Sequence, residues 1–86
     1  MKLKEGFVVR SVAGRIVALP TGDELNLNLM ITLNETGKFL WDMLAVGTTR
    51  DQLVSALLRE YEVDTERAGE SVDRFVEKLK ENGFLE

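Results

Sequence analysis

The pattern of apolar and polar positions divides the chain into a strand-like first third and a helical remainder. Two β-rich runs, residues 7–12 and 15–19, flank the dipeptide Ala13-Gly14, which suits a two-residue hairpin turn. Residues 20–23, with one proline and one glycine, then break the second run. This pattern predicts an antiparallel β-hairpin near the start of the chain.

A third strand is predicted from a period of two that begins at Leu25. Leucine or isoleucine occupies every second position from there to Leu33, and asparagine, methionine or threonine fills the positions between. Such a period is typical of a strand with one buried face. Because asparagine is rare in strands, we expect the strand mainly over residues 29–33.

Three amphipathic helices are predicted to follow, each with its own N-cap. Asn34 caps the first helix and Gly47 ends it. Thr49 opens a capping box over residues 49–52, and Asp64 caps the third helix. A period of 3.6 residues assigns each helix an apolar face. These faces centre on Leu40 and Leu44, then on Leu53, Val54, Leu57, Leu58 and Tyr61, and last on Ala68, Val72, Phe75, Val76 and Leu79.

The end of the third helix carries a stop signal. Gly83 suits the C′ position of a Schellman motif, in which Phe84 would contact Leu79. Three strands followed by three helices with short connections predict an α+β fold: a winged-helix-like, three-stranded antiparallel sheet followed by three helices. The 86 residues suffice for one domain, so we expect residues 1–86 to form a single unit.

Composition excludes several classes of chemistry. The chain has no histidine and no cysteine, which removes the usual general bases, nucleophile pairs and transition-metal ligands. Its carboxylates fall mostly on the outward faces of the predicted helices, where they alternate with lysine and arginine. We therefore expect no catalytic residues, no metal site and no cofactor.

Charge disfavours nucleic acid as a partner. The formal net charge is −4, and from residue 34 onward the chain has 7 basic against 12 acidic side chains. A winged helix that binds DNA would present basic side chains on its third helix.

The N-terminal sequence lacks the apolar run of a signal peptide, and no window is long enough to cross a membrane. We expect a cytoplasmic protein with no membrane partner.

Four segments follow one another along the chain: Leu33-Asn34, Phe39-Leu40-Trp41, residues 53–58 with Glu60-Tyr61, and residues 72–85. Each segment alone is common, whereas the ordered set covers nearly the whole chain. In this order the segments resemble those of the PqqD-like family, also called precursor-peptide recognition elements. One departure is Val46-Gly47, where Asp-Gly is common in the family, and it should alter only a turn.

The resemblance implies a non-catalytic peptide chaperone. Such a domain binds the leader of a ribosomally made precursor peptide as an added strand along its third strand, beside its third helix. It then presents the leader to a modifying enzyme, often of the radical S-adenosylmethionine type, in the pyrroloquinoline quinone pathway or another. The open strand edge could instead pair with a second copy to give a homodimer.

Mapped onto this chain, the resemblance gives a set of candidate peptide contacts. For each of them the alternative is ordinary core packing. Trp41 is expected at the edge of the core, with a partner surface as the alternative. Met30 is a stronger candidate because its parity points away from the buried leucines and methionine adapts to varied partners. Lys78 and Lys80 are expected either in solvent or against an acidic leader. The candidates are Leu29, Met30, Ile31, Thr32 and Leu33 on the strand, and Val72, Phe75, Val76 and Leu79 on the helix.

Two other functions remain open at this stage. An acidic winged-helix module for protein interaction or regulation would be favoured if the edge of the third strand were covered and no peptide bound. A DNA-binding regulator is disfavoured by charge, and salt-dependent DNA binding near neutral pH would be its signature.

Overall fold

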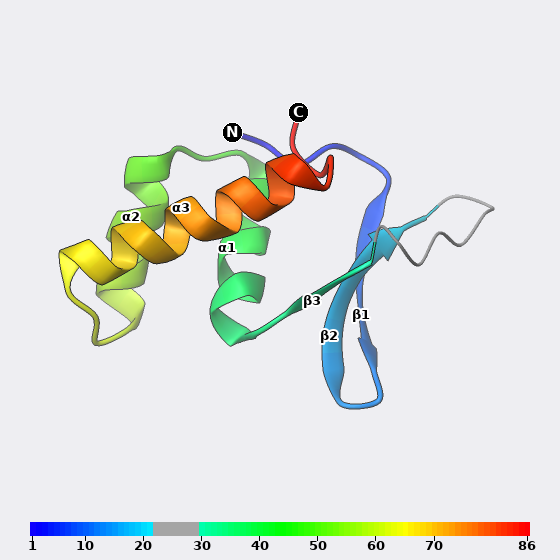
Figure 1. Cartoon of the computed structure of the whole chain (residues 1–86), viewed down its shortest axis with the longest axis horizontal. Coiled ribbons are helices and arrows are strands. Elements are labelled where there is room, and N and C mark those ends of the chain that lie inside the picture. Colours follow the sequence, from blue (N-terminus) through cyan, green and yellow to red (C-terminus); the bar gives the residue numbers. More distant parts are fainter. Residues whose placement is uncertain (22–29) are drawn as a thin grey trace.

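The computed structural model describes residues 1–21 and 30–86, in which a small sheet precedes a group of three helices (Figure 1). The predicted α+β architecture, an antiparallel sheet followed by helices, is confirmed. The sheet has the strand order β1-β2-β3. The elements are β1 (Phe7–Val12), β2 (Arg15–Pro20), β3 (Ile31–Leu33), α1 (Glu35–Val46), α2 (Arg50–Glu60) and α3 (Thr65–Glu81).

The hairpin forms where the sequence predicts it. Ala13 and Gly14 have φ angles of 51° and 78°, and a type I′ turn requires positive φ at both positions. β2 extends one residue further than predicted and ends with Pro20, which lies opposite Phe7. On the β1 side the missing N–H of Pro20 loses no hydrogen bond, because bonds alternate along an antiparallel pair and the N–H of the neighbouring Thr21 donates to the Gly6 carbonyl at 2.8 Å.

β3 forms one side of the sheet and leads directly into α1. It pairs antiparallel with β2, with Leu33 opposite Ile16. Ile31 and Leu33 are buried and Thr32 is exposed, which confirms the period of two over these residues. The strand is shorter than predicted, since Met30 precedes it. The remainder of the predicted alternation, residues 25–29, lies outside the described residues.

All three predicted N-caps are confirmed. The side-chain oxygens of Asn34, Thr49 and Asp64 accept hydrogen bonds from the backbone N–H three residues later, at 2.7, 3.2 and 2.7 Å. Gln52 completes the capping box, because its Oε1 accepts from the Thr49 backbone N–H at 3.1 Å. Local sequence signals therefore determine where each helix begins.

Removal of the Asn34 cap should weaken the junction between β3 and α1. We expect Asn34→Ala to lower the free energy of unfolding by about 1 kcal/mol, because the Gly37 N–H loses its acceptor. Urea denaturation followed by circular dichroism measures the change. Asn34→Ser keeps a cap oxygen and should retain most of the stability, so equal losses in both variants would argue against a capping role.

The C-terminus of α3 has the predicted Schellman geometry. Phe84 N–H donates to the Leu79 carbonyl at 2.9 Å and Gly83 N–H donates to the Lys80 carbonyl at 3.2 Å. Gly83 has a φ of 76°, which glycine adopts without steric cost. Leu79 and Phe84 are both fully buried in the same core.

The core differs from the prediction at two helical positions. Trp41, expected at the edge, is only 5% exposed and packs edge-to-face on Phe84 with ring centroids 5.6 Å apart. Leu58, expected on the buried face of the second helix, is 38% exposed, and Ala56 is buried instead. The apolar face of α2 is therefore rotated slightly from the one that the leucines suggested.

The two ends of the chain lie side by side, as Figure 1 shows. Leu3 and Leu85 form an antiparallel bridge, and Lys4 N–H donates to the Phe84 carbonyl at 2.8 Å. Both leucines are buried. The N-terminal segment thus covers part of the core near the end of α3, a contact that no local sequence pattern indicated.

An exposed ion pair joins α2 to α3. Arg50 Nε and Nη2 donate to the two carboxylate oxygens of Asp73 at 2.6 and 2.9 Å. These hydrogen bonds, with the guanidinium charge, hold the pKa of Asp73 below its usual 3.8. Because folding lowers this pKa, the pair stabilises the fold fully above about pH 3.8 and loses that contribution as pH falls through the folded value.

Acid unfolding should reveal this pair. Between about pH 4 and pH 2, the wild type should lose more free energy of unfolding than Asp73→Asn, which has no carboxylate to protonate there. Denaturation curves at several pH values measure the difference. Glu62→Gln is the control, since that exposed residue belongs to none of the ion pairs of the described residues and should leave the wild-type slope unchanged. Identical slopes for Asp73→Asn and the wild type would contradict the assignment.

Candidate functional site

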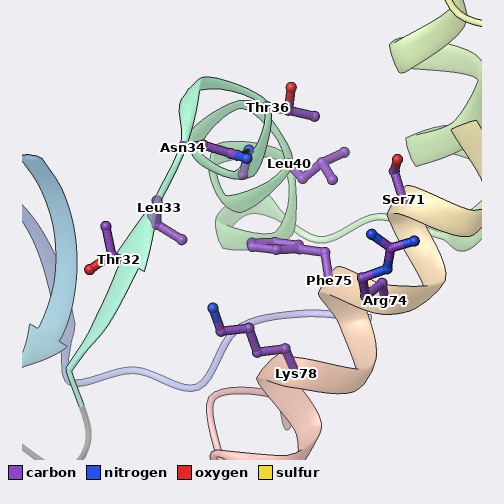
Figure 2. A pocket seen from close by; sticks show the side chains of 10 residues that line it. Thr32, Leu33, Asn34, Thr36, Leu40, Ser71, Arg74, Phe75 and Lys78 are labelled. Atoms are coloured by element: carbon purple, nitrogen blue, oxygen red, sulfur yellow. Dashed lines mark hydrogen bonds between the residues drawn. The ribbon is translucent and has the colours of Figure 1, made fainter.

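A groove with a cavity volume of about 450 Å³ lies between β3, the start of α1 and one face of α3 (Figure 2). It combines apolar, hydroxyl and basic side chains from parts of the chain that are far apart in sequence. The lining residues are Thr32, Leu33, Asn34, Thr36, Gly37, Leu40, Ser71, Arg74, Phe75 and Lys78.

The floor of the groove is apolar. Leu33 and Leu40 are almost fully buried, and the half-buried ring of Phe75 extends from α3 toward them (Figure 2). Gly37 lies against this floor: a Cβ there would lie 3.4 Å from Phe75 Cε1, which is close to an ordinary contact, and 3.1 Å from Asn34 Oδ1, which is a tight one. A side chain at position 37 would therefore press mainly on the Asn34 cap beside the floor.

The α3 side of the groove is basic. Arg74 and Lys78 are both exposed and lie about one helical turn apart. In Figure 2 the Lys78 side chain extends toward β3, and the Arg74 guanidinium extends toward Ser71. Among the residues that the structure describes, no acidic side chain lines the groove, although the chain as a whole is acidic.

β3 adds backbone hydrogen-bonding groups to this groove. Within the described residues it is the last strand of the sheet, so one side of it has no partner strand. Unpaired N–H and C=O groups at such an edge accept another extended chain. A strand added there would have one of its faces toward α3 and the apolar floor.

The sequence-predicted contacts fall into four groups. Thr32, Leu33 and Phe75 line the groove, and Met30, 40% exposed, immediately precedes the edge strand. Leu29 lies outside the described residues. The other candidates are buried in the core, with exposures of 8% or less: Ile31, Val72, Val76 and Leu79. Their role as peptide contacts stays a prediction.

Three α3 residues line the groove beyond the predicted set: Ser71, Arg74 and Lys78. Each is adjacent in sequence to one of the apolar positions chosen from the sequence, and each is polar. Lys78 was expected in solvent or against an acidic leader, and its place in the lining allows the second outcome. Lys80 is exposed and lies outside this lining.

A second hollow lies on the other side of α1, toward α2. Its apolar part comes from Phe39, Met43 and Val46, and Val46 is 83% exposed. Phe39 packs edge-to-face on Tyr61 with ring centroids 5.8 Å apart. None of the described residues that line this hollow belongs to a strand, which distinguishes it from the groove.

Two other kinds of site are absent from residues 1–21 and 30–86. No helix in that part is long and apolar enough to cross a membrane. No group of three or more Asp, Glu, His or Cys side chains in it is placed to hold a metal ion.

Comparison with known proteins gives matches in both sequence and structure. The family model described as coenzyme PQQ synthesis protein D (PqqD) matches residues 8–85. The structure "TbiB1 in Complex with the TbiA(beta) Leader Peptide" aligns with a TM-score of 0.77 and 23% identity, covering 100% of this chain and 95% of the other. The "Lasso peptide synthetase B1 complexed with the leader peptide" aligns with a TM-score of 0.74 and 25% identity, covering 96% and 93%. No curated protein matches the chain.

Proposed function

This chain belongs to the PqqD family, and on that premise we propose that it binds the leader of a ribosomally made precursor peptide and presents it to a separate modifying enzyme. The observation that carries the proposal is the groove, which joins a sheet edge to an apolar floor. An extended peptide gains backbone hydrogen bonds along such an edge, and the pockets beside it select side chains. The resemblance to a lasso peptide synthetase B1 complexed with a leader peptide supports the same class of ligand.

In the proposed complex the leader forms an additional strand next to β3. Every second side chain of that strand faces α3, and an apolar one covers Leu40 and Phe75 on the floor. Met30 contacts the leader at the start of β3, where its flexible thioether adapts to different side chains. Buried Val72, Val76 and Leu79 support Phe75 from beneath.

The proposed role is non-catalytic, and the single domain over residues 1–86 acts with a partner in the cytoplasm. A radical S-adenosylmethionine enzyme is the partner that family membership favours, in the pyrroloquinoline quinone pathway or in another peptide-modifying one. The leader is held by this chain while the enzyme acts on the remainder of the precursor.

A binding titration tests the function. The leader region of a short peptide encoded beside this chain's gene is fluorescently labelled, and its anisotropy is followed as the protein is added. We expect a dissociation constant on the order of micromolar, because ordering a flexible peptide offsets part of the contact energy. The core region of the same precursor is the control and should not bind. Equal binding of both, or of neither, would favour the acidic interaction module.

Self-association through β3 is a competitor for the same edge. If a homodimer forms there, an excess of leader should convert it to a monomer in sedimentation experiments. A dimer that persists with leader bound would place the self-contact elsewhere on the surface.

A further inference from the structure

The distribution of charge around the groove points to the chemistry of the leader. We propose that the groove selects leaders with an acidic side chain two residues before or after an apolar one. This inference rests on the leader-binding function proposed above and adds a specificity to it.

The first observation is a local reversal of charge. The chain carries a net charge of −4, yet the charged side chains that line the groove within residues 1–21 and 30–86 are those of Arg74 and Lys78, both basic. Neither forms an ion pair within the described residues, whereas Lys38 and Arg50 do. Two cations beside an apolar floor favour a ligand that brings a carboxylate with its apolar anchor.

The second observation is a match of spacing. Arg74 and Lys78 are four positions apart on α3, which corresponds to a rise of about 6 Å along the helix. Residues i and i+2 of an extended peptide lie about 6.6 Å apart, and their two side chains face the same way. Phe75 lies next to Arg74 and extends into the floor between the two cations (Figure 2). An apolar side chain over Phe75 therefore has its neighbour two residues away within reach of one cation.

Carboxylates on the outer side of α3 limit how strongly the two groove cations attract an acidic side chain of the leader. Glu77 and Glu81 line a shallow hollow next to Arg74 and Lys78, on the side away from the groove floor, and Asp73 there is paired with Arg50. These groups weaken the attraction for an incoming carboxylate without blocking it, because they are exposed and screened by solvent. We expect each groove cation to change affinity by about fivefold.

The chain offers a matched pair of control cations. Arg67 and Lys80 are exposed residues of the same helix, and they lie outside the groove lining. The variant R67E/K80E therefore changes the net charge by the same amount as R74E/K78E. A difference between the two variants reports the position of the charges rather than their number.

Peptide selection tests the proposal without knowledge of the natural leader. An mRNA-displayed library of random peptides of about twelve residues, enough for a strand and its flanks, is selected against the wild type, R74E/K78E and R67E/K80E. Circular dichroism checks that all three are folded. We expect the wild type and R67E/K80E to enrich Asp or Glu two residues from an apolar residue. R74E/K78E should instead enrich Lys or Arg at that position, and should bind the wild-type peptides at least tenfold more weakly.

The selection distinguishes a failure of the acidic specificity from a failure of leader binding. Peptides that bind the wild type and lose affinity in Phe75→Ala, but show no excess of Asp or Glu, would overturn the specificity and leave the leader-binding function intact. The same acidic preference in R74E/K78E would also overturn it. Failure of the wild type to enrich any peptide would count against the leader-binding function and, with it, the specificity.

Discussion

Replacing Phe84 with alanine should lower the free energy of unfolding by about 3–5 kcal/mol, a large share of the stability expected for a domain of this size. Phe84 is fully buried, and its ring lies 4.4 Å from that of Phe7 and 5.6 Å from that of Trp41, centroid to centroid. It joins β1, α1 and the end of α3. No smaller side chain can fill that space, so the variant carries a cavity at the meeting point of three elements.

Urea denaturation measures this loss, and Trp41 provides the signal because it is the only tryptophan and packs on Phe84. Val46→Ala is the control: its side chain is 83% exposed and should change stability by less than about 0.5 kcal/mol. A loss for Phe84→Ala as small as that of the control would mean that the ring is not a core residue in solution.

Replacing Phe75 with alanine should weaken leader binding by about tenfold or more, because the apolar floor loses the ring that a leader side chain would cover. The ring is only half-buried in the free protein, so part of its apolar surface is available to a ligand. Anisotropy titration with the leader measures the change, and circular dichroism confirms that the variant is folded.

Phe39→Ala is the matched control for this prediction. Phe39 is also a half-buried phenylalanine, but it lines the hollow between α1 and α2 rather than the groove. Both substitutions remove the same group from the surface of the helical part. We expect leader affinity to fall only for Phe75→Ala, and a larger loss for Phe39→Ala would move the peptide site to the other side of α1.

Features with local causes were predictable from the sequence. The caps at Asn34, Thr49 and Asp64 depend on a side chain and an N–H only three residues away. The turn at Ala13-Gly14 depends on two backbone conformations. The order of strands and helices follows from such signals together with the period of the apolar positions.

Features that depend on tertiary packing were not predictable in the same way. Trp41 is buried because Phe84, far away in the sequence, covers it. Helical periodicity identified the apolar stripe of α3, but which flank of that stripe faces the groove depends on where β3 lies. Arg74 and Lys78 line the groove for that reason, whereas Val72 and Leu79 are buried in the core.

Amide hydrogen exchange of the isotopically labelled protein, followed by NMR with and without leader, tests the central proposal most directly. If the leader joins the sheet, it should slow the exchange of edge amides in residues 30–34 and shift resonances of residues 71–78 of α3, while α2 stays unchanged. Changes restricted to the hollow around Phe39 and Val46, with exchange at β3 unaffected, would contradict strand addition as the mode of binding.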